Sequence, residues 1–234
     1  MNIAIILAGG VGSRMKVLDR PKQYVEVKGR PVISYCLQTF QEYADIDAIY
    51  IVADESWQDY ISTWIEKEHI SKFAGFAPAG KSRQHSIYNG LIACEKSVVS
   101  PEDIVILHDA ARPFVTPEII EQCILGATEL EGAMPVITVK DTVYRSVDGK
   151  SITSLLDRSE LFAGQAPESF RYGKYRKIHE DASDEEIMNT RGSSEIAYNH
   201  GMKIRLFEGA EKNFKITTME DLTNFEAELN KEGV

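Results

Sequence analysis

Glycines are concentrated in a turn near the N-terminus, Ala8-Gly9-Gly10-Val11-Gly12-Ser13-Arg14, directly after an apolar run. Glycines let the backbone approach a ligand closely and expose its N–H groups to phosphate oxygens. The spacing matches neither the Walker phosphate loop nor the dinucleotide fingerprint, and such a turn can also be a tight connection. Arg14 ends the turn, and Lys22 follows Pro21. Two cations placed there in an acidic chain favour the binding of a triphosphate.

A second polar group, beginning His108-Asp109-Ala110, follows another apolar run at residues 104–107. Open α/β sheets place their ligands at the carboxyl ends of strands. Asp109 is therefore a candidate Mg²⁺ ligand, because one carboxylate with phosphate oxygens and waters is the usual environment of that ion. The alternative is a turn or capping residue. His108 is predicted to be a hydrogen-bonded structural residue.

The elements that must hold these residues alternate between short apolar runs and amphipathic segments. Several of the runs are apolar at every position, which is typical of a sheet covered by helices on both faces. We predict an α/β fold, a Rossmann-like and mostly parallel sheet, in one domain over residues 1–234. Strands are predicted at 3–7, 48–53, 104–107, 135–139 and 204–207, and helices at 31–40, 57–68, 83–94, 117–130, 172–180 and 219–232.

A turn sequence, Val147-Asp148-Gly149-Lys150, separates two segments that contain β-branched residues, 141–146 and 151–156. This pattern predicts a β-hairpin that projects from the body as an arm at about residues 141–160. Two helix starts are also well marked. Thr116 precedes a proline and an acid, and Thr218 stands three residues before Asp221 in a capping-box spacing.

The composition excludes some partners. Lys and Arg total 26 against 36 Asp and Glu, a net charge of -10, which is the wrong sign for general attraction to nucleic acid or an anionic membrane. The longest apolar run, residues 3–8, is far shorter than the roughly 20 residues that span a bilayer. The N-terminus lacks a signal-peptide pattern, so we expect a cytoplasmic protein. The three cysteines, Cys36, Cys94 and Cys123, are odd in number and widely spaced, which predicts reduced core thiols.

Several motifs in fixed order resemble those of the sugar-alcohol-phosphate cytidylyltransferases. This family includes enzymes for 2-C-methyl-D-erythritol 4-phosphate, in isoprenoid synthesis, and for ribitol 5-phosphate, in teichoic-acid synthesis. The resemblance covers nearly the whole chain. It rests on LAGGVGSRM from Leu7, PKQY from Pro21, SRQHSIYNGL from Ser82, HDAARPF from His108, DTV from Asp141, LDRS from Leu156 and NFKITT from Asn213.

The resemblance implies a Mg²⁺-dependent reaction of CTP with a polyol phosphate, in which Asp109 binds the metal. It also implies a homodimer in which the arm of one subunit reaches the acceptor site of its partner. Catalysis would rest on Arg14, Lys22, Arg158 and Lys215. In nucleotide binding, the family pattern places Ala8, Gly9, Gly10, Arg14 and Lys22 at the triphosphate, Gly80, Arg83 and Ser86 at the cytidine, and Ala110 at the ribose. At the acceptor it places Thr142 and Arg158 from the arm and Lys215 from the body.

The chain departs from the family in two segments near the expected acceptor site. Ala166 and Glu168 stand where relatives usually read threonine and glutamine, and Arg191 stands where an acid is common. Gly164-Gln165 resembles the ribitol branch, whereas residues 82–91 and 156–162 resemble the methylerythritol branch. We favour methylerythritol 4-phosphate as the acceptor, with ribitol 5-phosphate or another polyol or sugar phosphate as the alternative. A sugar-1-phosphate nucleotidyltransferase and a non-catalytic nucleotide-binding relative are the rival readings.

Overall fold

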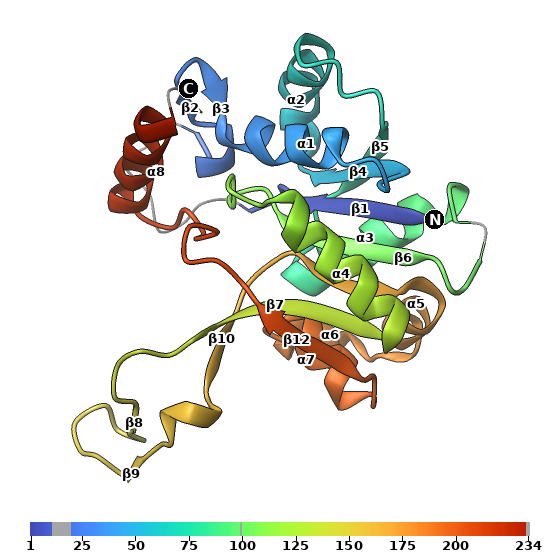
Figure 1. Cartoon of the computed structure of the whole chain (residues 1–234). Coiled ribbons are helices and arrows are strands. Elements are labelled where there is room, and N and C mark those ends of the chain that lie inside the picture. The colour runs from blue at the N-terminus through green and yellow to red at the C-terminus, as the bar shows by residue number, and fades with distance from the viewer. Residues whose placement is uncertain (11–19, 99, 233–234) are drawn as a thin grey trace.

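The computed structural model describes residues 1–10, 20–98 and 100–232. In these residues an eight-stranded sheet forms the centre of the molecule (Figure 1). Its strands run in the order β10-β7-β11-β6-β1-β4-β5, and β12 pairs with the other edge of β7. The strands are β1 (Asn2–Leu7), β4 (Ala48–Ala53), β5 (Phe73–Pro78), β6 (Ile104–Asp109), β7 (Gly132–Thr138), β10 (Phe162–Gly164), β11 (Glu168–Arg171) and β12 (Ile204–Glu208).

The sheet is mostly parallel. Parallel pairing joins β5, β4, β1 and β6 in that order, and it also joins β12 to β7. Strand β10 runs antiparallel to β7, and β11 runs antiparallel to β6 and β7. Every residue of β4 and β6 is buried, as their unbroken apolar runs require when helices cover both faces. The helices are α1 (Val32–Glu42), α2 (Glu55–Lys67), α3 (Arg83–Ala93), α4 (Pro117–Glu129), α5 (Tyr172–Asp181), α6 (Asp184–Asn189), α7 (Ser193–Asn199) and α8 (Met219–Glu232).

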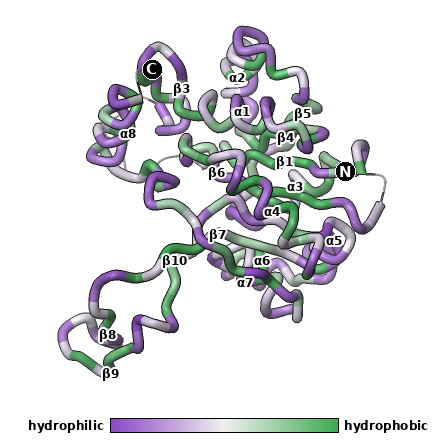
Figure 2. The backbone as a smooth tube through the Cα atoms, viewed as in Figure 1, coloured by the Kyte–Doolittle hydropathy of each residue, from purple (hydrophilic) through white to green (hydrophobic). Residues whose placement is uncertain are grey.

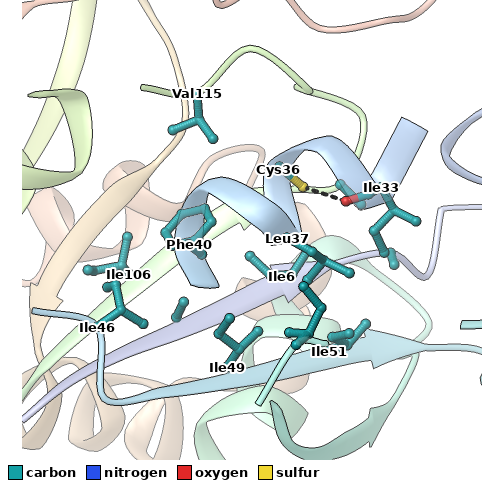
Figure 3. Packing of buried hydrophobic residues seen from close by; sticks show 14 of the residues in the cluster. Ile6, Ile33, Cys36, Leu37, Phe40, Ile46, Ile49, Ile51, Ile106 and Val115 are labelled. Carbon is teal, nitrogen blue, oxygen red and sulfur yellow. Dashed lines mark hydrogen bonds between the residues drawn. The ribbon is translucent and has the colours of Figure 1, made fainter. Parts of the chain in front are cut away.

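Alternate residues of the central strands pack into two separate cores. Ile6 of β1 and its neighbours on one face meet Leu37 and Phe40 of α1, as Figure 3 shows, together with residues of α2 and α4. Ile5 faces the opposite way and packs with residues of α3, α5 and α7. This division follows from the two-residue repeat of a strand, which sends successive side chains to opposite faces. Figure 2 shows the hydrophobic residues concentrated along β1 and β6.

Smaller elements complete the molecule. A 3-10 turn, η1 (Lys22–Tyr24), follows the glycine-rich segment and precedes the short pair β2 (Glu26–Val27) and β3 (Arg30–Pro31). Helix α8 covers this pair through Phe225 and Leu229, which pack against Val27. Two further 3-10 turns are η2 (Cys94–Lys96) and η3 (Arg158–Glu160).

The segment between β7 and β10 reaches away from the sheet as a long arm (Figure 1). Its strands β8 (Tyr144–Arg145) and β9 (Ser154–Leu155) pair antiparallel around a turn in which Gly149 has a φ of +69°. A positive φ is readily adopted by glycine, so the Asp-Gly turn suits this hairpin. We call residues 141–160 the arm.

The predicted α/β class, with a mostly parallel sheet covered on both faces, is confirmed. Each predicted strand and helix is present, with ends shifted by a few residues at most. The pattern missed β2, β3, β5, β10, β11, α6 and α7. Helices α6 and α7 have six and seven residues, too few to display a helical repeat, and β10 and β11 have three and four. The predicted caps are confirmed, since Thr116 accepts from the Ile119 N–H and Thr218 exchanges bonds with Asp221.

Cys36, Cys94 and Cys123 are buried and free, as predicted for core thiols. Over the part of the chain that the structure describes, no helix combines the length and apolar character that crossing a bilayer requires.

Candidate active site

The start of the glycine-rich turn, residues 8–10, lies beside Asp109 because β1 and β6 are parallel neighbours in the sheet. Leu7, the last residue of β1, is paired in register with Asp109, the last residue of β6. The Ala110 N–H donates to the Leu7 carbonyl at 3.1 Å, and the Ala8 N–H donates to the Val52 carbonyl of β4 at 2.8 Å. Three strand ends therefore hold this edge of the sheet together, at the carboxyl end where a ligand site is expected.

Side chains of η1 hydrogen-bond to the first residues of the turn. The Gln23 side chain donates to the carbonyls of Ala8 and Gly10, and the Tyr24 hydroxyl donates to the Ala8 carbonyl. A Cβ at Gly9 would lie 2.6 Å from the Ala79 side chain, whereas one at Gly10 would meet no described residue within 4 Å. Gly9 is thus needed for packing, and Gly10 is exposed. Arg14 lies outside the described residues.

The start of α3 is built against a second glycine. The Gly80 N–H donates to the Ser86 hydroxyl at 3.0 Å, and Ser82 caps the helix by accepting from the His85 N–H. A Cβ at Gly80 would lie 2.4 Å from the Cβ of His85 and 2.6 Å from its backbone carbon. Only glycine permits this approach. It brings Gly80, Ser86 and the first helical residue, Arg83, to the same edge of the sheet.

Asp109 is the centre of a charge cluster. Its Oδ2 accepts from the Lys215 ammonium at 2.9 Å and lies 3.7 Å from Nε of Arg112, and its Oδ1 lies 3.4 Å from the Arg83 guanidinium. Burial alone raises the pKa of this carboxyl, but the three cations outweigh burial and hold the pKa well below its usual range. Asp109 is therefore ionised throughout the physiological range.

Glu168, a residue to which sequence analysis assigned no role, is a second buried carboxylate in the cluster. Its Oε1 lies 3.5 Å from the Arg83 guanidinium, and its Oε2 accepts from the Ser194 N–H at 2.9 Å. Arg83 also donates to the Ser193 hydroxyl at the start of α7. The segment Glu168–Arg171 has one apolar residue and gives no signal for this role, because the partners of Glu168 are distant in sequence.

Arg112 was part of a recognised motif without an assigned role. It donates to the Asn213 carbonyl at 2.6 Å, and the fully buried Asn213 side chain donates to the Ala166 carbonyl at 2.8 Å. These bonds fix the segment that carries Lys215 next to the segment that carries Ala166. His108 is a buried structural residue, as predicted. Its Nε2 is paired with the Arg112 carbonyl at 2.9 Å, and burial lowers its pKa to about 4.

The structure does not bring the two arm residues to the Asp109 cluster of the same chain. Thr142 and Arg158 are exposed, and the Arg158 guanidinium donates to the Lys140 carbonyl at the base of the arm. In Figure 1 the arm points away from the strand ends. The predicted role of these residues therefore requires a second subunit.

The two segments that depart from the family pattern differ in exposure. Ala166 is 3% exposed. The Gln165 side chain is bonded to the backbone of Ala210 through both its ends, so it supports the loop at Gly209. Arg191 is exposed at the turn before α7, where its N–H donates to the Glu195 carboxylate.

The residues of this site fit a divalent cation that takes most of its ligands from phosphates. No group of three or more His, Cys, Asp or Glu side chains suited to a metal occurs in residues 1–10, 20–98 and 100–232. A protein-only cage is thus lacking there, whereas Asp109 is an ionised carboxylate beside the glycine-rich turn. One carboxylate with phosphate oxygens and waters is a common environment of Mg²⁺.

Comparisons with known proteins identify the family of this chain. The family model for 2-C-methyl-D-erythritol 4-phosphate cytidylyltransferase (IspD) matches residues 2–231. The enzyme of that name from Clostridium acetobutylicum is 39% identical over 236 residues, covering 100% of both chains. A ribitol-5-phosphate cytidylyltransferase from Streptococcus agalactiae is 34% identical over 97% of this chain and 95% of that protein. The crystal structure of 4-diphosphocytidyl-2C-methyl-D-erythritol synthase from Anaerococcus prevotii matches with a TM-score of 0.83 and 25% identity, covering 98% and 96% of the two chains. Because the family model spans almost the whole chain and both relatives exceed 30% identity, the protein belongs to the IspD family of cytidylyltransferases.

Proposed function

We propose that this cytidylyltransferase joins the CMP part of CTP to the phosphate of a sugar alcohol and releases pyrophosphate. The observation that carries the proposal is the register of β1 with β6, which brings the start of the glycine-rich turn, residues 8–10, beside the Asp109 cluster. Backbone N–H groups at the turn suit a triphosphate, and the cations of the cluster suit a second phosphate. Two phosphate-binding features on one edge are what the transfer of a nucleotidyl group needs.

In the proposed reaction an oxygen of the acceptor phosphate attacks the α-phosphorus of CTP, and the bond to the bridging oxygen of pyrophosphate breaks. The attacking oxygen is already anionic at neutral pH, so no general base is required. The protein must instead orient two polyanions and spread the developing charge. Lys22, Arg14 and the N–H groups of Gly9 and Gly10 would contact the triphosphate, and Lys215 would face the acceptor.

Asp109 would hold the Mg²⁺ ion together with phosphate oxygens. A bound divalent cation supplies positive charge to the phosphates during transfer. The Lys215 ammonium donates to Oδ2 of Asp109. With Mg²⁺ and the nucleotide bound, Lys215 would either share Asp109 with the ion or turn toward the acceptor phosphate. Arg83 is also held by Glu168 and Ser193, and so keeps partners independent of Asp109.

We favour 2-C-methyl-D-erythritol 4-phosphate as the acceptor. The family model and the 39% identity to the Clostridium enzyme support this choice. Ribitol 5-phosphate is the second candidate, favoured by the relative from Streptococcus at 34% identity. The Gly164-Gln165 resemblance adds no weight to the second candidate, because both ends of the Gln165 side chain are engaged by backbone.

The site is proposed to be completed by the arm of a second subunit. Large apolar side chains of the arm are exposed, namely Tyr144 at 55%, Val147 at 81%, Ile152 at 67% and Leu155 at 64%. A hairpin with so much apolar surface is suited to contact with another protein surface. An isologous dimer would place each arm, with Thr142 and Arg158, over the partner's Asp109 cluster.

Pyrophosphate release with CTP and Mg²⁺ tests the proposal. The acceptors would be methylerythritol 4-phosphate, ribitol 5-phosphate, related polyol phosphates and a blank without acceptor. We expect release with methylerythritol 4-phosphate and none in the blank. Release with ribitol 5-phosphate alone would identify ribitol 5-phosphate as the acceptor instead. Failure to bind CTP would overturn the nucleotide site itself.

Replacing Lys22 by alanine is expected to lower kcat about 100-fold, because a cation that stabilises the transferring phosphoryl group is lost. The melting temperature should stay close to that of the wild type, since the Lys22 side chain is only partly buried. Unchanged turnover in this variant would remove Lys22 from the mechanism.

A further inference from the structure

Gln23 makes two short hydrogen bonds to the glycine-rich turn. Its Nε2 lies 2.6 Å from the Ala8 carbonyl oxygen and 2.9 Å from the Gly10 carbonyl oxygen, and the residue is only 3% exposed. Both partners are acceptors, so the amide NH₂ must face them, and the assignment of nitrogen and oxygen in this side chain is unambiguous. A single buried amide thus joins two carbonyls on either side of Gly9.

These bonds orient the turn as well as support it. In a trans peptide the C=O and the following N–H point in opposite directions. Because the Ala8 carbonyl faces Gln23, the Gly9 N–H points away from Gln23. A flexible glycine pair would otherwise sample many orientations, since glycine has the widest backbone freedom. Gln23 therefore restricts the direction in which the Gly9 N–H can act as a donor.

The support beneath Gln23 is rigid. Its neighbour Tyr24 is 1% exposed, donates to the Ala8 carbonyl at 2.9 Å, and stacks on Trp57 of α2 with ring centroids 4.5 Å apart. Lys22 is the first residue of the same 3-10 turn. Lys22 is thus joined to Ala8 through Gln23 and Tyr24, and to Gly10 through Gln23, on a support of packed aromatic rings.

We infer that Gln23 is a positioning residue that holds residues 8–10 of the glycine-rich turn and Lys22 in one fixed arrangement toward the triphosphate. The inference rests on the proposed function, because it assumes that both features bind the phosphates of CTP. When the amide is lost, the turn can still bind CTP after adjusting its backbone, but the Lys22 ammonium and the turn no longer act together in the transition state. Misplacement on the scale of 1 Å is enough to cost a large factor in rate.

The test uses Gln23→Met, which keeps the length of the side chain and removes both donors. This variant should fold, because the Ala8 carbonyl keeps its bond from Tyr24 and Gly10 is exposed to water. Tyr24→Phe is the matched control. It removes a hydrogen bond to the same Ala8 carbonyl and leaves Gly10 held by Gln23.

We expect Gln23→Met to lower kcat for pyrophosphate release about tenfold, with the Kd for CTP changed less than threefold. Tyr24→Phe should stay within about threefold of the wild-type kcat, since the Gly10 bond remains. Combined with Lys22→Ala, the Gln23→Met change should cost less than twofold more, because residues that act as one unit are not additive. The slow double variant is measured with enzyme in excess over CTP.

Three results would overturn the inference: a kcat for Gln23→Met within twofold of wild type, an equal loss for Tyr24→Phe, or the full tenfold loss again in the Lys22→Ala background. The last two would mean that the amide only stabilises the local fold. Wild-type protein that releases no pyrophosphate with any acceptor would contradict the proposed function instead, so the two failures are distinguishable.

Discussion

At the scale of single residues, Asp109 shows how burial and ion pairing compete. A buried carboxylate is costly unless charged partners compensate for the lost water. Lys215, Arg83 and Arg112 do so, while Glu168 offsets part of their charge. The cluster stays positive by one unit when these five side chains are counted, which suits phosphate binding.

Asp109→Asn should destabilise the protein at pH 7 on the order of 3 kcal/mol, because three partly buried cations lose their shared carboxylate. The folded-state pKa of Asp109 lies below the unfolded value of about 3.9, so its stabilisation is present above that pH and is lost as the pH falls toward the folded pKa. Urea unfolding of both proteins from pH 7 to pH 3 would measure this. A difference that stays constant to pH 3 would contradict the ion-pair account.

At the scale of elements, two glycines serve different purposes. Gly80 packs against the first turn of α3, where a Cβ would overlap the His85 backbone, whereas a Cβ at Gly10 would contact none of the described residues. The first allows a helix to dock on the sheet, and the second leaves room for a ligand. We expect Gly80→Ala to lower the melting temperature by several degrees, since overpacking typically costs 1–3 kcal/mol.

Gly10→Ala should melt like the wild type and yet bind CTP more weakly, because the added methyl group projects into the space that the triphosphate would occupy. Thermal melting and calorimetric CTP binding of the two variants would separate these effects. Equal destabilisation by both substitutions would show that Gly10 also serves the fold.

At the scale of the whole molecule, the arm extends away from the body of its own chain (Figure 1). Arg158 and Thr142 are exposed on this arm, so the acceptor-binding role proposed for them would depend on a partner subunit. Arg158→Ala alone should raise the KM for the acceptor and leave the KM for CTP nearly unchanged.

Mixing subunits tests the exchange of arms directly. The Lys22→Ala subunit has an intact arm, and the Arg158→Ala subunit has an intact nucleotide site. After denaturation and joint refolding, half of the dimers are mixed and each has one complete site, so about a quarter of wild-type activity should return. No recovery, with sedimentation showing that mixed dimers formed, would place Arg158 outside the partner's site.

The sequence by itself determined the alternation of strands and helices, the glycine-rich turn, the arm and the family. These properties depend on local repeats of two or 3.6 residues and on contiguous motifs, which neighbouring residues in the chain specify. It also placed Asp109 and Lys215 in one site, through the resemblance to known enzymes. The short elements β10, β11, α6 and α7 carried no such repeat.

Only the tertiary structure decided which side chains meet. Arg83 and Glu168 are 85 residues apart, and Lys215 and Asp109 are 106 apart. The pairing of β11 with β6 brings Glu168 to the strand end that carries Asp109. The bonds from Arg112 to the Asn213 carbonyl and from the Ile216 N–H to the Ala111 carbonyl hold the Lys215 segment there. The Gln23 contacts likewise depend on how η1 packs beneath the turn. Such pairings result from burial of whole elements against one sheet, a long-range effect that no local pattern encodes.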